Sequence, residues 1–287
     1  MRTWLAQRPV VSFYVLTLTL SWGYWLALLA QGRRVVPGSV VTHFPGLLGP
    51  MLAAMLVTAA IKGRKGLQAL LGRMTQLGPH WPFSLALALS PLVLGACAVL
   101  VLASVGQAVP SANAFARFPG LPQGWPLAGV VAVVLLVDGF GEETGWRGFL
   151  FERLLPEHGR WRATLVVALL WSAWHLPLFW LNTSMAALRG PVFFGWLFAI
   201  VCGAFVLAYV YLATGHSILC VALWHTGYNM MAGTENGTGL VSAVIAAVVM
   251  LWGGTIAIRW LRRPRDEPRV DPQPELVTVR HGSAEPG

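Results

Sequence analysis

The sequence predicts an all-α fold, namely a polytopic membrane bundle of about eight transmembrane helices. Hydrophobic residues make up 56% of the 287 residues and charged residues only 11%, whereas about a quarter of a soluble domain is charged. The mean hydropathy is +0.64. The apolar residues also gather in segments of about 20 residues, which is the length that spans a bilayer as a helix.

Eight apolar segments are the candidate spans in chain order. The fourth and seventh are short, but the polar residues at their borders can lie at membrane depth inside a protein-lined cavity. We expect the fourth segment to continue to Leu155 as one long, tilted helix. The membrane domain is therefore predicted to cover 1–262, with a motif-bearing core at 126–231. The eight segments lie near 10–29, 40–61, 81–105, 126–140, 163–181, 192–213, 217–231 and 241–260.

The distribution of Lys and Arg predicts the orientation of the bundle. If the N-terminus is cytoplasmic, sixteen of the twenty Lys and Arg residues fall on the cytoplasmic side. Cytoplasmic loops are enriched in these residues, so this orientation is favoured. We expect an integral membrane protein with both termini in the cytoplasm, located in the cell membrane if the source is prokaryotic. The opposite side holds Arg33, Arg34, Arg117 and Arg189.

The charged residues after Arg263 indicate a disordered tail, and the scattered basic residues argue against nucleic acid as a partner. After Arg263 the chain is rich in Pro, Glu and Arg and has little to bury, so 263–287 is predicted to be a disordered cytoplasmic tail. The net charge of +9 comes from residues scattered over short loops and this tail. They form no basic stripe along a helix, and we expect no nucleic-acid partner.

An acidic cluster in the fourth segment is the strongest functional signal. Asp138, Glu142 and Glu143 fall within six positions of an apolar region, where ionisable side chains are costly. Residues four apart share a helix face, so Glu143 is expected to pair with Arg147, which leaves Glu142 without a basic neighbour. A carboxyl group in such a site can exchange protons with water and with a leaving group. A cluster at a helix end, at the level of the lipid headgroups, is the alternative explanation.

Two histidines lie deep inside later apolar segments. His175 is about 12 residues into its segment, or about 18 Å, which is too deep for snorkelling to the interface. Pro177 removes a backbone hydrogen bond and can free a carbonyl for water or a ligand. His225 and Asn229, four apart, project from one side of a helix, and their side chains suit stabilisation of an oxyanion. Packing and interhelical hydrogen bonding are the alternatives for each residue.

In this order, the three motifs resemble those of a known family. Glu142-Glu143-x-x-x-Arg147, Trp171-x-x-x-His175 and His225-x-x-x-Asn229 are similar to motifs of the CAAX protease and bacteriocin-processing (CPBP) family of intramembrane endopeptidases. This family includes the CAAX prenyl endopeptidases. The resemblance covers 138–231. The family usually has Phe where this chain has Trp171, so the aromatic character is kept and the packing detail differs.

The resemblance implies a role for each motif. Glu142 would activate a water molecule with help from His175. His225 and Asn229 would stabilise the oxyanion, and Glu143 with Arg147 would complete the first motif. Because the predicted topology puts Glu142 toward the cytoplasmic end of the fourth helix, we expect a cavity that opens to the cytoplasm.

The sequence therefore predicts a CAAX-type glutamic endopeptidase of the membrane that hydrolyses peptide bonds of membrane-associated peptides or proteins. No cofactor is expected, although a Glu and two His on separate helices could also hold zinc in a metal-dependent version. Two non-enzymatic functions stay open. One is a proton-coupled transporter, although the inverted repeats common in transporters are not evident. The other is a non-catalytic family member that acts in bacteriocin immunity or as a scaffold.

Overall fold

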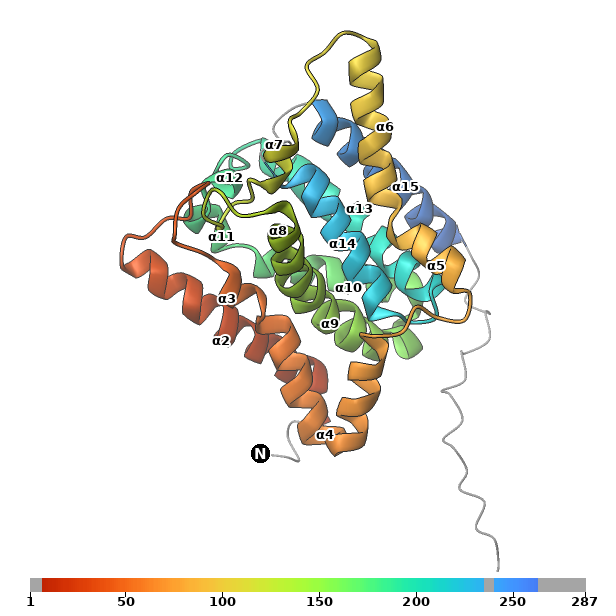
Figure 1. Cartoon of the computed structure of the whole chain (residues 1–287). Coiled ribbons are helices and arrows are strands. Elements are labelled where there is room, and N and C mark those ends of the chain that lie inside the picture. Colours follow the sequence, from red (N-terminus) through yellow and green to blue (C-terminus); the bar gives the residue numbers. More distant parts are fainter. Residues whose placement is uncertain (1–6, 235–239, 263–287) are drawn as a thin grey trace, which may run out of the picture.

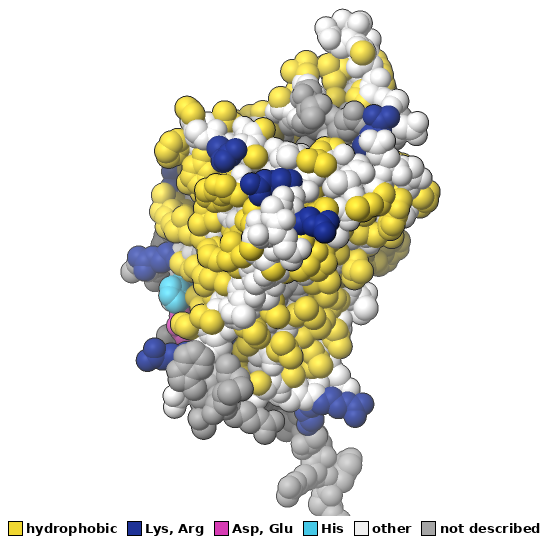
Figure 2. All heavy atoms as spheres, turned by 90° about the vertical axis from the view of Figure 1, so that its left-hand side faces the viewer, with side chains coloured by type: hydrophobic (Ala, Val, Ile, Leu, Met, Phe, Trp, Pro, Cys, Tyr) yellow, Lys and Arg dark blue, Asp and Glu magenta, His cyan; other side chains and the backbone are white. Residues whose placement is uncertain are grey.

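The computed structural model describes residues 7–234 and 240–262. The described residues form helices joined by loops and contain no strand beyond two isolated bridges, which confirms the all-α prediction. The predicted tail, 263–287, lies outside the described residues. Hydrophobic side chains cover much of the face shown in Figure 2, with Lys and Arg side chains in its upper part, along its left edge and at the bottom. This surface is typical of a membrane-embedded bundle.

The first half of the bundle is built from two long helices and one bent pair. α2 (Pro9–Ala30) packs along α4 (Gly49–Arg73), with the short α3 (Phe44–Leu47) between them (Figure 1). α4 is broken at Gly63, where φ is 61°, a value that favours glycine. α5 (Trp81–Ala88) and α6 (Ser90–Ser104) are bent by 47° relative to each other. α7 (Ala112–Ala116) follows in a loop.

The motif-bearing region begins with one long helical run. It passes through α8 (Leu127–Val134), the π-helix η1 (Leu135–Phe140), α9 (Gly141–Gly145), the π-helix η2 (Trp146–Phe151) and α10 (Glu152–Trp174). The run reaches Leu155, as predicted, and continues beyond it. It is broken within α10 at Gly159, where φ is 70° and ψ is 170°.

The second half completes the bundle around this run. α11 (Leu178–Leu181) and α12 (Thr183–Ala186) are short. α13 (Val192–Ala213) and α15 (Leu240–Arg262) pack against each other, and α14 (Ile218–Ala232) packs against η1.

The structure does not confirm the predicted number of membrane spans. Five described helical stretches are long and apolar enough to cross a membrane, or six if the bent α5–α6 pair is one span. The stretch Leu127–Leu181 counts once but contains the fourth and fifth predicted segments. α14 has only 15 residues, fewer than the roughly 20 that a span needs. The count of eight is therefore not confirmed.

The loops gather at two ends of the bundle. At one end, which we call the rim end, loops 31–43, 105–126 and 182–191 meet, and isolated bridges join Val35 to Asn182 and Gly38 to Pro122. At the other end, which we call the basal end, loops 74–80 and 214–217 meet. There Gly78, at φ 84°, lies so close to the Thr214 carbonyl that a Cβ would overlap it. α2 begins at the basal end and finishes at the rim end (Figure 1).

Candidate active site

Two glycines hold the acidic motif close to its neighbouring helices. A Cβ on Gly145 would lie 2.8 Å from the carbonyl oxygen of Pro50 on α4. A Cβ on Gly139 would lie 3.0 Å from the carbonyl oxygen of Ala222 on α14. Glycine therefore allows the run to pack tightly between α4 and α14. As a result, the two intervening glutamates, Glu142 and Glu143, are buried.

Glu143 is the anchor of the first motif. Both of its carboxylate oxygens accept from Arg147 Nη1 at 3.0 Å, which confirms the predicted pair. His225 Nδ1 on α14 also lies 2.7 Å from Glu143 Oε1. Because a carboxylate only accepts, His225 carries its hydrogen on Nδ1 and keeps Nε2 for another contact. Glu143 and Arg147 are 0% and 1% exposed, so this network is dry.

Glu142 is held by a residue of the second motif. Trp171 Nε1 donates to Glu142 Oε2 at 2.6 Å. The Trp171 ring also lies under the guanidinium of Arg147, 4.7 Å from its centroid, and meets the His225 ring edge-on at 5.7 Å. The comparison of Trp171 with the usual Phe predicted only a difference in packing and missed this hydrogen bond. The sequence did contain a signal for it, because Trp has an N–H donor and Phe has none.

His175 lies at the point where α10 ends. Its backbone N–H donates to the Ser172 carbonyl instead of continuing the α-helical pattern. The Trp171 carbonyl is thereby left for the His175 ring, whose Nδ1 lies 2.7 Å away. Since a carbonyl only accepts, Nδ1 carries the hydrogen and Nε2 of the neutral ring is an acceptor. The helix end agrees with the expectation that Pro177 opens this segment.

Asn229 is oriented by Asp138. Its Nδ2 donates to Asp138 Oδ2 at 3.0 Å, from α14 to η1. This contact directs the amide nitrogen of Asn229 toward the carboxylate and leaves its second N–H for another acceptor. The other oxygen of Asp138, Oδ1, is buried and has no hydrogen-bond partner among the described residues.

The four residues predicted to be catalytic line one cavity of about 810 Å³. Three helical regions far apart in the sequence bring them together. The wall facing them is mostly apolar and comes from α13, including Trp196, Ile200 and Leu207. Glu143 and Arg147 lie behind the polar wall, in the dry network described above. The cavity-lining catalytic candidates are Glu142, His175, His225 and Asn229.

The cavity continues to the rim end. Its lining includes Gly38 and Gln123 from two rim-end loops and Ser184 from the short helix α12 at the same end. Among the described residues, none of the basal-end loops 74–80 or 214–217 contributes to the lining. Since α2 starts at the basal end, the expected cytoplasmic termini and the expected cytoplasmic cavity are incompatible in this fold. The sequence pattern predicts the position of Glu142 along its helix but does not predict at which end of the bundle its cavity opens.

The described arrangement does not form a zinc site. No three His, Cys, Asp or Glu side chains of the described residues come together as metal ligands, whereas a catalytic zinc takes three protein ligands. His225 Nδ1 and His175 Nδ1 are engaged by Glu143 and by the Trp171 carbonyl. We derive no step through a metal ion.

Comparison with known proteins confirms the predicted resemblance. Residues 123–231 match the sequence model of a family described as type II CAAX prenyl endopeptidase, Rce1-like. The chain is also 24% identical over 221 residues to a protein named CAAX prenyl protease 2 from Methanococcus maripaludis, covering 72% of this chain and 79% of that protein. The matched segment contains all three motifs. These similarities support a membrane endopeptidase.

Proposed function

We propose that this protein is a glutamic intramembrane endopeptidase in which Glu142 activates the water that cleaves a peptide bond. The observation that carries the proposal is the gathering of Glu142, His175, His225 and Asn229 around one cavity from three helical regions. A transporter or a scaffold does not require these groups to face one another. We propose no cofactor, because Glu142 can take the proton of the water itself.

The contacts of Glu142 and His175 suit the attack step. Trp171 holds Glu142 Oε2, which leaves Oε1 to accept a proton from water. The acceptor nitrogen of His175, Nε2, orients the same water molecule. The water oxygen then bonds to the peptide carbonyl carbon, and the carbonyl π electrons move onto its oxygen.

Asn229 and His225 suit the stabilisation of the resulting oxyanion. The free N–H of Asn229 donates as a neutral group. His225 can donate from Nε2 only as an imidazolium, because Nδ1 already donates to Glu143. We propose that His225 takes this proton from solvent before the substrate binds and stays an imidazolium beside the Glu143 carboxylate throughout the reaction. Preorganised donors of this kind typically contribute about 10²–10³-fold to turnover.

Collapse of the intermediate completes the reaction. The electron pair on the oxyanion re-forms the carbonyl, and the carbon–nitrogen bond breaks. Glu142 returns its proton to the leaving nitrogen, so the products are a carboxylic acid and an amine. The substrate is proposed to be a membrane-associated peptide or protein, because the cavity combines an apolar wall on α13 with polar groups at membrane depth.

A cleavage assay with purified protein tests this proposal. Wild-type protein in detergent or liposomes is incubated with a library of peptides, with and without a lipid chain, and products are identified by mass spectrometry. We expect Glu142→Gln to slow cleavage by about 10²–10⁴-fold. Glu157→Gln is the matched control, because Glu157 is an exposed carboxylate outside the cavity, and it should cleave like wild type. Cleavage by Glu142→Gln at the wild-type rate would exclude Glu142 as the base.

A further inference from the structure

The catalytic cavity has its access at only one end of the described bundle. Gly38, Gln123 and Ser184 bring the lining to the rim end, whereas the described basal-end loops contribute nothing to it. The catalytic candidates lie at the inner end of this cavity. A substrate that enters from the water at one end of the bundle therefore passes the rim-end loops.

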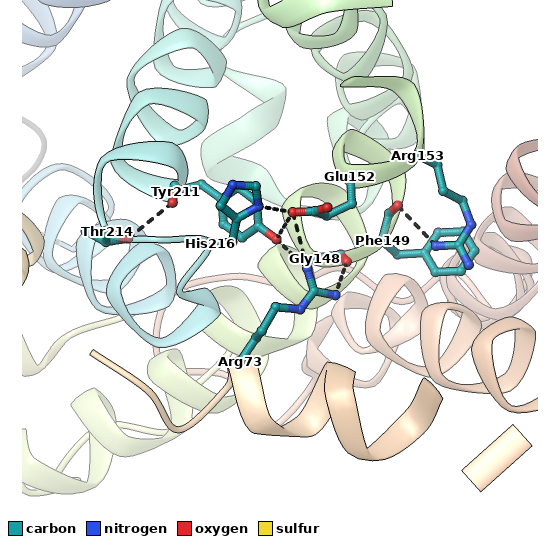
Figure 3. A network of polar contacts seen from close by, with 8 residues as sticks. All are labelled: Arg73, Gly148, Phe149, Glu152, Arg153, Tyr211, Thr214 and His216. Atoms are coloured by element: carbon teal, nitrogen blue, oxygen red, sulfur yellow. Dashed lines mark hydrogen bonds and ion pairs between the residues drawn. The ribbon is translucent and has the colours of Figure 1, made fainter. Parts of the chain in front are cut away.

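A polar network closes the basal end (Figure 3). Arg73 of α4 donates to the Gly148 carbonyl at 2.7 Å and lies 3.4 Å from Glu152. Glu152 also accepts from the Tyr211 hydroxyl at 2.7 Å and contacts His216. These contacts tie α4, η2, α10 and α13 together beneath the site. The basal end is thus held shut by residues from four parts of the chain.

The positive charge lies mainly at the basal end. By the course of the helices, the rim end carries four arginines: Arg33, Arg34, Arg117 and Arg189. The basal end carries a larger set of basic residues in the described part of the chain: Arg8, Lys62, Arg64, Lys65, Arg73, Arg153, Arg160, Arg162, Arg259 and Arg262. Arg147 is left out of this comparison because it is buried inside the bundle and belongs to neither end. Basic residues stay on the cytoplasmic side of a membrane, so the basal end is assigned to the cytoplasm.

We propose that the catalytic cavity opens at the extracytoplasmic face of the membrane. Its substrates are then polypeptides displayed on that face, either anchored in the outer leaflet or exported, and not cytoplasmic proteins. The hydrolysis of these substrates rests on the proposed function. The direction of the opening rests only on the cavity lining, the closed basal end and the distribution of charge.

Cysteine labelling in whole cells tests the orientation without requiring turnover. In a Cys97→Ala background, which leaves only buried cysteines, single cysteines replace exposed residues at each end. The rim-end variants are Gln31→Cys and Ser184→Cys, and the basal-end variants are Gln68→Cys and Glu157→Cys. We expect a membrane-impermeant maleimide to label the rim-end variants in intact cells. The basal-end variants should be labelled only after permeabilisation.

The other outcomes overturn the proposal. Labelling of the basal-end variants in intact cells, alone or together with the rim-end variants, would show an inverted or mixed orientation. Labelling of all four variants only after permeabilisation would show that the rim end is not extracytoplasmic. Two variants at each end guard against failure of any one to fold.

A second measurement links the orientation to catalysis. A cleavable, membrane-impermeant peptide identified with the purified enzyme is added to right-side-out and to inside-out vesicles. We expect cleavage in the right-side-out vesicles and its loss in the inside-out ones, with Glu142→Gln as the blank. The reverse result overturns the proposed opening. If no peptide is cleaved by the purified enzyme, the proposed function fails, while the labelling result still decides the orientation.

Discussion

Glu142 and Glu143 are neighbours in the sequence but lie in different environments. Glu143 is fully buried and contacts Arg147 and His225, so both of its carboxylate oxygens have partners. Glu142 faces the cavity and accepts one hydrogen bond from Trp171. The difference shows that two adjacent acidic residues in a membrane helix can have separate roles. The Glu143 carboxylate connects neighbouring helices, whereas the Glu142 carboxylate is available to react in the cavity.

The largest effect is expected from Glu142→Gln. The substitution keeps the shape of the side chain and removes the base, which typically contributes about 10²–10⁴-fold to turnover. The hydrogen bond from Trp171 can still form with the amide oxygen. We therefore expect kcat to fall by this amount with an unchanged melting temperature in detergent. A large drop in melting temperature would show that Glu142 is structural, like its neighbour.

Glu143→Gln is expected to lower the stability of the protein, which Glu142→Gln leaves unchanged. It leaves the buried Arg147 charge without its carboxylate, and breaking a buried ion pair costs about 3–5 kcal/mol. The free energy of unfolding should fall by about this amount, measured by denaturant titration in detergent. Glu157→Gln, at an exposed position, serves as the control and should leave it unchanged. If Glu143→Gln leaves the free energy of unfolding unchanged, the structural role given to Glu143 is wrong.

Trp171→Phe tests how Glu142 is oriented. Phe keeps the ring but removes the N–H donor to Glu142 Oε2, and a hydrogen bond to a charged group contributes about 1.5–3 kcal/mol. We expect kcat to fall by roughly 10- to 100-fold, with KM little changed. Trp174→Phe is a matched control, because the Trp174 indole N–H has no hydrogen-bond partner among the described residues. If Trp171→Phe and Trp174→Phe lose kcat equally, Trp171 contributes through packing and not through its hydrogen bond to Glu142.

The smallest effect is expected from Asp138→Asn. This change weakens the contact that orients Asn229, and a neutral hydrogen bond contributes about 0.5–1.5 kcal/mol. Turnover should fall by about 2- to 10-fold, measured as kcat in the peptide assay. Asp138→Asn combined with Asn229→Ala should lose no more than Asn229→Ala alone. Additive losses would show that Asp138 acts independently of Asn229.

The features predicted correctly from the sequence depend on local geometry. The apolar segments indicate helices, and the spacing of Glu143 and Arg147 predicts their pair, because residues four apart share a helix face. The order of the motifs also predicted the family resemblance. These inferences need only the periodicity of one helix and the types of its residues.

The features that the sequence did not predict depend on how helices pack. His225 contacts Glu143 across 82 positions, a contact that requires the close approach allowed by Gly139. The role of Trp171 depends on which way its ring points. The number of spans was also not confirmed, because Leu127–Leu181 forms one helical stretch and α14 is short. The direction of the cavity follows from loop contacts that no single motif encodes.

The network of Arg73, Glu152, Tyr211 and His216 has a consequence for the cell as well as for the enzyme. A water-filled cavity that extends into a bilayer shortens the nonaqueous path that a proton must cross between the two sides of the membrane. Because this network closes the basal end, packed protein separates the cavity from the basal side of the membrane. We therefore expect the protein not to raise the leakage of protons across the membrane.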